Sequence, residues 1–114
     1  MDIAAEQVAV CAKYGATLMP VPPESKVGIA QNARQGHLPL NGLRLGTEGG
    51  TCGWYIWGGE EFSEAADFFA PMHATHLVEE CPRVLKYLGL PPGWRFLIAD
   101  GYEDVWFDPS LLKS

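Results

Sequence analysis

The sequence has few cysteines, and no pattern pairs them. Its three cysteines, Cys11, Cys52 and Cys81, form no CxxC motif and no even disulfide framework. Free thiols, mostly buried, in a reducing compartment are therefore expected. No apolar run approaches the roughly 18 residues that a membrane span needs. The chain opens on Met1-Asp2 without the basic and apolar segments of a signal peptide. Together these absences predict a cytoplasmic protein that does not enter a membrane.

The sequence also lacks the common signatures of catalysis. It contains no Gly-x-Ser-x-Gly, no phosphate-binding glycine loop with a lysine, and no dinucleotide-binding fingerprint. The glycines at 46, 49, 50 and 53 are not framed by the strand and helix that would make them a nucleotide loop. No cofactor and no metal is expected. The sequence therefore favours a protein that binds over an enzyme.

What is present is sufficient for a packed core. The chain has 114 residues, 47% of them hydrophobic, with four Trp, four Tyr and five Phe. A chain of this length fits one domain, here residues 1–114, and can bury enough surface without metals or disulfides. The large aromatic side chains supply much of that apolar area.

The N-terminal half predicts one helix and several strands. Helical spacing of apolar residues over 2–14, followed by Gly15, indicates a helix, and residues 26–30 indicate a short strand. Asn41-Gly42, within 38–45, predicts a hairpin turn. Residues 54–57 (WYIW) predict a strand in the centre of the sheet, because bulky groups occupy both of its faces.

The C-terminal half predicts a broken helix and a hairpin. An apolar stripe over 75–88 indicates a helix that Pro82 kinks or divides in two. Asp100-Gly101 predicts a turn between strands 94–99 and 103–107. The expected fold class is α+β: a mostly antiparallel sheet with two or three helices packed on it, as a single pair of layers.

Charge is unevenly distributed along the chain. The formal net charge is −6; residues 1–46 carry four bases and three acids, whereas residues 47–114 carry four bases and eleven acids. Acids concentrate at 60–67 and 100–108. Such a surface repels phosphate backbones, so nucleic acid is not an expected partner. A basic protein would be steered toward it. The alternative is an acidic surface that is merely solvated.

Two groups of side chains are candidates for metal or thiol chemistry. His73, His76 and Cys81 are zinc-ligand types, but no second pair completes a tetrahedral set. We expect the histidines to form hydrogen bonds at a helix start and Cys81 to pack. Cys52, between Thr51 and Gly53, lies in a neighbourhood similar to that of a thiol-protease nucleophile, but the accompanying residue order and spacing are missing. A small buried thiol explains it.

A third candidate is the acidic group Glu60, Glu61, Glu64 and Asp67. If this segment were helical, Glu60, Glu64 and Asp67 would share one face, as in metal and acid–base sites. Exposed acids are the default, and contact with a partner is the stronger of the two functional interpretations.

Several segments together resemble a known family. They are residues 51–60 (TCGWYIWGGE), 67–69 (DFF), 71–73 (PMH), 81–82 (CP), 87–97 (YLGLPPGWRFL) and 102–108 (YEDVWFD). In amino-acid sequence and in order they resemble the Imm-thirty-three-like (Imm33-like) immunity-protein domain of bacterial polymorphic toxin systems, over about residues 28–112. The resemblance implies an antitoxin that binds and blocks a cognate toxin protein. It implies no catalytic residues.

The leading hypothesis is an immunity protein that covers its toxin with acidic and aromatic side chains. From charge and aromatic character we expect the partner-binding residues to be Trp57, Glu60, Glu61, Glu64, Asp67, Tyr102, Glu103 and Asp104. Two alternatives remain. One is a small enzyme that uses Cys52 or the carboxylates of Glu60, Glu64 and Asp67. The other is an interaction domain whose partner is not a toxin.

Overall fold

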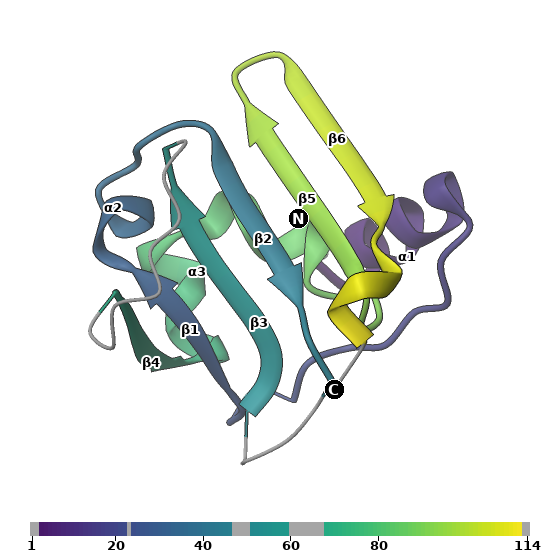
Figure 1. The fold of residues 1–114 in the computed structure, drawn as a ribbon, viewed down its shortest axis with the longest axis horizontal. Coiled ribbons are helices and arrows are strands. Elements are labelled where there is room, and N and C mark those ends of the chain that lie inside the picture. The colour runs from purple at the N-terminus through teal and green to yellow at the C-terminus, as the bar shows by residue number, and fades with distance from the viewer. Residues whose placement is uncertain (1–2, 23, 47–50, 60–67, 113–114) are drawn as a thin grey trace.

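A six-stranded sheet with the strand order β4-β1-β3-β2-β5-β6 forms the centre of the protein (Figure 1). The structure is a computed structural model that describes residues 3–22, 24–46, 51–59 and 68–112. The strands are β1 (Lys26–Ala30), β2 (Leu40–Arg44), β3 (Thr51–Gly58), β4 (Phe69–His73), β5 (Trp94–Ala99) and β6 (Tyr102–Phe107). The helices are α1 (Ile3–Tyr14), α2 (Gln31–Arg34) and α3 (Leu77–Glu80), with 3₁₀ turns η1 (Ala74–His76), η2 (Pro82–Tyr87) and η3 (Pro109–Leu112).

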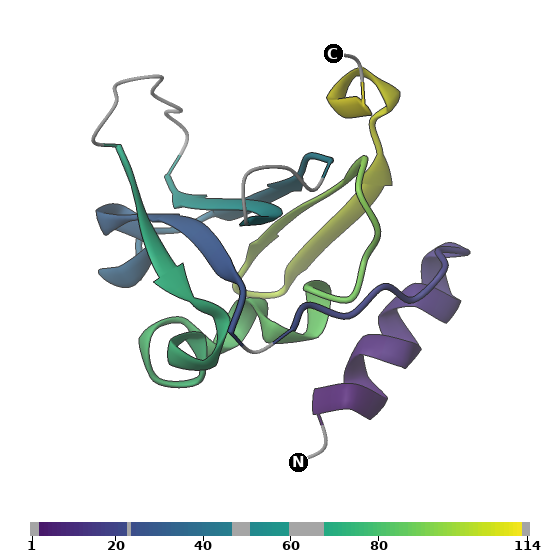
Figure 2. The same ribbon diagram turned by 90° about the horizontal axis from the view of Figure 1, so that it is seen from below.

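The sheet is mostly antiparallel, and it is open at both ends. Among the strands that the structure describes, only the pair β1–β3 is parallel; the other four pairs are antiparallel. Figure 2 shows α1, α3 and η2 on one side of the sheet, which we call the inner face. The opposite side is the outer face. This arrangement confirms the α+β class predicted from the sequence.

Most of the strongly patterned segments adopt the predicted structure. The N-terminal helix, the strand β1 and the central position of β3 are confirmed. The hairpin β5–β6 turns at Asp100-Gly101, with Gly101 at a φ of 71°. The helical segment after residue 74 divides at Pro82, which is the first residue of η2. Proline is tolerated there because the first turn of a helix leaves its N–H groups unpaired.

The predicted hairpin turn at Asn41-Gly42 is wrong. Strand β2 runs straight through both residues and pairs with β3 and β5. Gly42 serves close packing instead: a Cβ there would lie 2.2 Å from the ring of Phe96. Asn41 donates from its side-chain amide to the carbonyl of Gly59 at 2.8 Å and so ties the beginning of β2 to the end of β3. Tertiary contacts thus override the local turn signal.

Strand β4 has no counterpart among the elements predicted from the sequence, and Pro71 lies in its middle. Proline cannot donate to a ladder and is found at sheet edges, which is where β4 lies. The core lies between the inner face and the helices. Phe96, which is almost fully buried, contacts the ring of Trp54 at 5.6 Å and stacks on Tyr87 at 4.9 Å between centroids.

Arg44 is a charged side chain inside this core, only 2% exposed. Its guanidinium donates to the carbonyls of Cys52 at 3.0 Å, Met19 at 2.7 Å and Leu90 at 2.7 Å, with a longer contact to that of Leu88 at 3.4 Å. It also lies 5.8 Å from the ring of Trp54. Desolvation lowers the pKa of Arg44, while backbone oxygens replace the lost water. One cation therefore joins β2 to β3, to the connector after α1 and to the turn after η2.

Replacing Arg44 is expected to lower the free energy of unfolding far more than replacing an exposed arginine. Arg44→Met removes the donor and leaves buried carbonyls unpaired, so the free energy of unfolding should fall by about 3 kcal/mol or more. Arg34→Met is the matched control: it breaks only a partly exposed pair with Glu80 at 2.9 Å, worth about 0–1 kcal/mol. Urea denaturation of both variants measures the difference. Equal losses would contradict the role assigned to Arg44.

Candidate partner-binding surface

Strand β6 divides its side chains between the two faces of the sheet. Val105 belongs to the core, and Glu103 binds residues of α1 and η2, so both point to the inner face. Because side chains alternate along a strand, Tyr102, Asp104 and Trp106 point to the outer face. Of the predicted partner-binding residues, the structure therefore brings Tyr102 and Asp104 together and turns Glu103 away from them.

The outer side of β6 carries exposed aromatic and acidic groups. Tyr102 is 55% exposed, and Asp104 is also exposed. None of the hydrogen bonds or ion pairs within the described part of the chain involves the Asp104 carboxylate. A carboxylate without a partner, between two aromatic side chains, can pair with a cation of another molecule.

Two residues that the sequence analysis did not single out complete this surface. Arg95, on the neighbouring β5, lies over the ring of Trp106 at 5.5 Å and pairs with Asp108 at 3.2 Å. Its Nε is buried and has no hydrogen-bond partner among the described residues. We call Arg95, Tyr102, Asp104 and Trp106 the outer strip. The period-two alternation of residues 102, 104 and 106 in the sequence is a signal that could have placed Trp106 beside the other two.

Trp57 and Glu103, the other predicted partner-binding residues that the structure describes, do not belong to the outer strip. Trp57, which was predicted to contact the partner, is only 5% exposed, so its indole is not available at the surface. It lies in β3, where its ring is 6.3 Å from that of Phe69. Glu60, Glu61, Glu64 and Asp67 lie outside the described residues.

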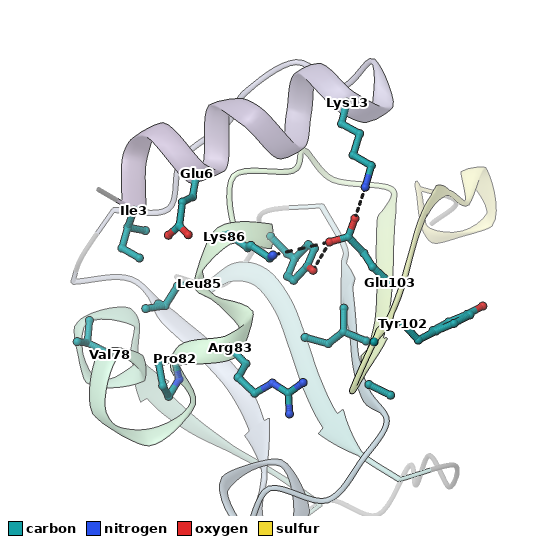
Figure 3. A pocket seen from close by; sticks show the side chains of 14 residues that line it. Ile3, Glu6, Lys13, Val78, Pro82, Arg83, Leu85, Lys86, Tyr102 and Glu103 are labelled. Carbon is teal, nitrogen blue, oxygen red and sulfur yellow. Dashed lines mark hydrogen bonds and ion pairs between the residues drawn. The ribbon is translucent and has the colours of Figure 1, made fainter. Parts of the chain in front are cut away.

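Glu103 lines a groove on the inner face (Figure 3). The groove has a volume of about 720 Å³ and runs between α1, η2 and the β5–β6 hairpin. Its apolar lining includes Ile3, Leu85 and Ile98, and its rim carries the cations Lys13, Arg83 and Lys86. In Figure 3, Glu103 points into this space and Tyr102 points away from it.

The carboxylate of Glu103 is fully engaged by neighbours. It accepts hydrogen bonds from the hydroxyls of Tyr14 at 2.6 Å and Tyr87 at 2.5 Å, and from Lys13 at 2.9 Å. Lys86 lies 3.9 Å away. Desolvation acts to raise the pKa of Glu103, but the hydrogen bonds from Tyr14, Tyr87 and Lys13 outweigh it and lower the pKa to about 2. Such a carboxylate stays ionised and is a poor general base, so its role here is to hold α1, η2 and β6 together.

Cys52 does not have the environment of an activated nucleophile. Its thiol is buried and donates to the carbonyl of Lys26 at 3.3 Å. Desolvation raises its pKa, which keeps the sulfur protonated at neutral pH. Reactive cysteines have the opposite character: a lowered pKa and access to solvent.

The histidine pair does not lie on a common helical face. His73 ends β4 and His76 ends η1, with ring centroids 5.8 Å apart. The expected hydrogen bonds at a helix start are absent for both, since neither side chain caps η1 or α3. Cys81 is buried and packs, as expected, with its sulfur 3.9 Å from the carbonyl of Ala33. Across the described ranges, no three His, Cys, Asp or Glu side chains are arranged to hold a metal ion.

The fold and the outer strip define a small α+β protein whose exposed features suit binding. The chain matches the family model of the Imm33-like domain over residues 6–108, which is most of its length, and it belongs to this family. No curated protein and no solved structure matches it. Within the described residues, none of the helices has the length and apolar character needed to cross a membrane.

The Glu103 cluster makes stability depend on acidity in a defined range. The folded-state pKa of Glu103 is about 2, below the ordinary value of 4.5. Its stabilising contribution is therefore complete above pH 4.5 and is lost as pH falls toward 2. The shift corresponds to roughly 3 kcal/mol at most, because solvent still reaches part of the side chain.

Glu103→Gln should lower the free energy of unfolding at pH 7 by roughly 1–3 kcal/mol, and the difference from the unmodified protein should shrink toward pH 2. The adjacent exposed residue supplies the control, since Asp104→Asn breaks no contact within the described chain. Urea denaturation between pH 2 and 7 measures both. A Glu103→Gln deficit that is constant over this range would show that the cluster is not electrostatic.

Proposed function

We propose that this protein is a cytoplasmic immunity protein that binds a toxin protein of a bacterial polymorphic toxin system and neutralises it. Membership of the Imm33-like domain family carries the proposal. Neutralisation by binding needs an accessible, chemically selective surface and no catalytic group. The outer strip offers such a surface, with exposed Tyr102 and Asp104 on one strand.

The chemistry of the polar groups supports binding rather than turnover. The three thiols are buried, and desolvation raises the pKa of each. Glu103 is held by two tyrosine hydroxyls and a lysine. The thiols and the Glu103 carboxylate, which are the residue types that could act in catalysis, are thus engaged in packing or in structural hydrogen bonds. The exposed groups of β6 are free to contact another protein.

The toxin is proposed to be basic where it meets this protein. The chain has a net charge of −6, and eleven of its fourteen acids follow residue 46. Charges of this kind raise the rate of association with a basic partner through long-range attraction. On this proposal, Glu60, Glu61, Glu64 and Asp67 contribute to the attraction together with Asp104.

Co-expression with a candidate toxin gene, sought among the genes next to this one, tests the function directly. The protein should restore growth to cells that produce the toxin and should form a complex with the purified toxin domain. A complex with no effect on toxicity, or protection without a complex, would contradict neutralisation by binding.

The charge proposal is tested by matched charge reversals. Glu60→Lys with Glu61→Lys should lower the association rate about tenfold at low salt, and the loss should shrink above about 0.3 M salt as screening shortens the field. Glu24→Lys with Glu79→Lys changes the net charge equally in another part of the chain and should have a smaller effect. Stopped-flow binding measures both rates. Equal effects would mean that only net charge matters, and no effect would mean that these acids are solvated surface.

A further inference from the structure

The two edge strands of the sheet, β4 and β6, differ in the backbone groups that are available to pair with another strand. In the antiparallel pair β5–β6, Asp108 donates its backbone N–H to the carbonyl of Gly93 at 2.7 Å. Residues facing each other across an antiparallel pair alternate between hydrogen-bonded and non-hydrogen-bonded pairs. Trp106, Asp104 and Tyr102 therefore also bond inward, to Arg95, Leu97 and Ala99.

The alternate residues of β6 direct their backbone groups away from the sheet. These residues are Glu103, Val105 and Phe107. Apart from β5, no described strand pairs with β6, and none of the backbone hydrogen bonds that the described residues form outside the strand ladders involves the N–H or C=O of these three residues. Phe107 is 47% exposed, whereas the side chain of Val105 is held in the core. In the view of Figure 1, α1 passes behind β6, on the inner face, and extends beyond it.

The opposite edge, β4, is blocked by a proline. Ala74 donates its N–H to the carbonyl of Ser25 at 2.8 Å, which makes Met72 and Ala70 the inward-bonding residues of β4. Pro71 therefore lies at the central outward position, where it has no N–H to donate. Proline at such a position is a common protection against unwanted strand pairing. No proline protects β6 over residues 102–107.

We propose that β6 is the docking edge for an extended segment of the toxin, which adds to the sheet as a seventh strand. This inference rests on the proposed function and names the mode of binding. Backbone hydrogen bonds to Glu103, Val105 and Phe107 supply affinity, as in other cases of strand addition. On the outer face, the added strand would place its side chains beside Tyr102, Asp104 and Trp106.

The outer strip determines the chemistry of that segment. Cross-strand neighbours lie about 5 Å apart, so a Lys or Arg beside Asp104 would form an ion pair with its free carboxylate. Apolar or aromatic residues two positions away would pack on Tyr102 and Trp106. The partner is thus an extended basic and apolar segment. A second copy of this chain would bring acidic edges together at a net charge of −6 each, which disfavours it.

Amide hydrogen exchange by NMR tests the edge directly, with the purified toxin domain identified by co-expression as the probe. In the free protein, the amides of Glu103, Val105 and Phe107 should exchange faster than the inward amides of Tyr102, Asp104 and Trp106. Binding should slow the outward set at least tenfold and leave Phe69 and His73 of β4 unchanged.

Matched variants test whether the backbone and Asp104 contribute to binding. Phe107→Pro and Phe107→Ala both remove the ring, but only the proline removes the outward N–H, so its affinity should be about tenfold lower than that of the alanine variant. Asp104→Lys should weaken binding about tenfold or more, whereas Glu79→Lys, an equal charge change on α3, should weaken it less than twofold. Calorimetry measures the affinities, and thermal unfolding confirms that each variant is folded.

The outcomes separate the two proposals. A complex with protected outward amides supports strand addition. A complex that leaves these amides exchanging as before overturns the docking edge and leaves the immunity function standing. The absence of any complex overturns both. Protection that appears without toxin and grows with protein concentration assigns the edge to self-association and overturns the proposal.

Discussion

The buried guanidinium of Arg44 is the interaction on which the arrangement of the sheet depends. It links backbone carbonyls from three separate segments: the connector after α1, strand β3 and the turn after η2. The carbonyl of Arg44 itself accepts the N–H of Gly93 at 2.7 Å, at the start of β5. A buried cation is costly unless oxygens replace its water, and here the backbone supplies them. Strand β5 begins directly after Gly93, so the position of the β5–β6 hairpin depends on the position of Arg44.

The inner side of β6 is held by a second polar cluster. Glu103 binds Tyr14 of α1 and Tyr87 of η2, so one carboxylate ties the edge strand to both helical segments. A fully engaged inner side gives the strand a stable backbone. The outward N–H groups and the outer strip of the same strand are then held in a definite geometry. A rigid strand loses less entropy when a partner binds to it.

The buried and the exposed polar groups of the described residues differ in what they can react with or bind. Thiols that would be nucleophiles in an enzyme are buried here with raised pKa values. The free carboxylate of Asp104 and the exposed ring of Tyr102 lie instead on an edge strand. A chain of this kind has its chemical selectivity on the surface, where a partner protein can meet it.

The sequence by itself determined the local elements and the family. Alternation over 94–107, the Asp100-Gly101 turn and the glycine after the first helix are short-range signals, and the structure agrees with them. Only the tertiary structure decided the rest. Asn41-Gly42 has the composition of a turn, but β2 continues through it and pairs with β3 and β5. Gly42 is required there because any Cβ would clash with the ring of Phe96. The burial of Trp57, the inward direction of Glu103 and the edge position of Pro71 all depend on strand order and register. Strand order and register are long-range properties. Residues adjacent in the sheet can be far apart in the chain, and no local pattern records which strands will be neighbours.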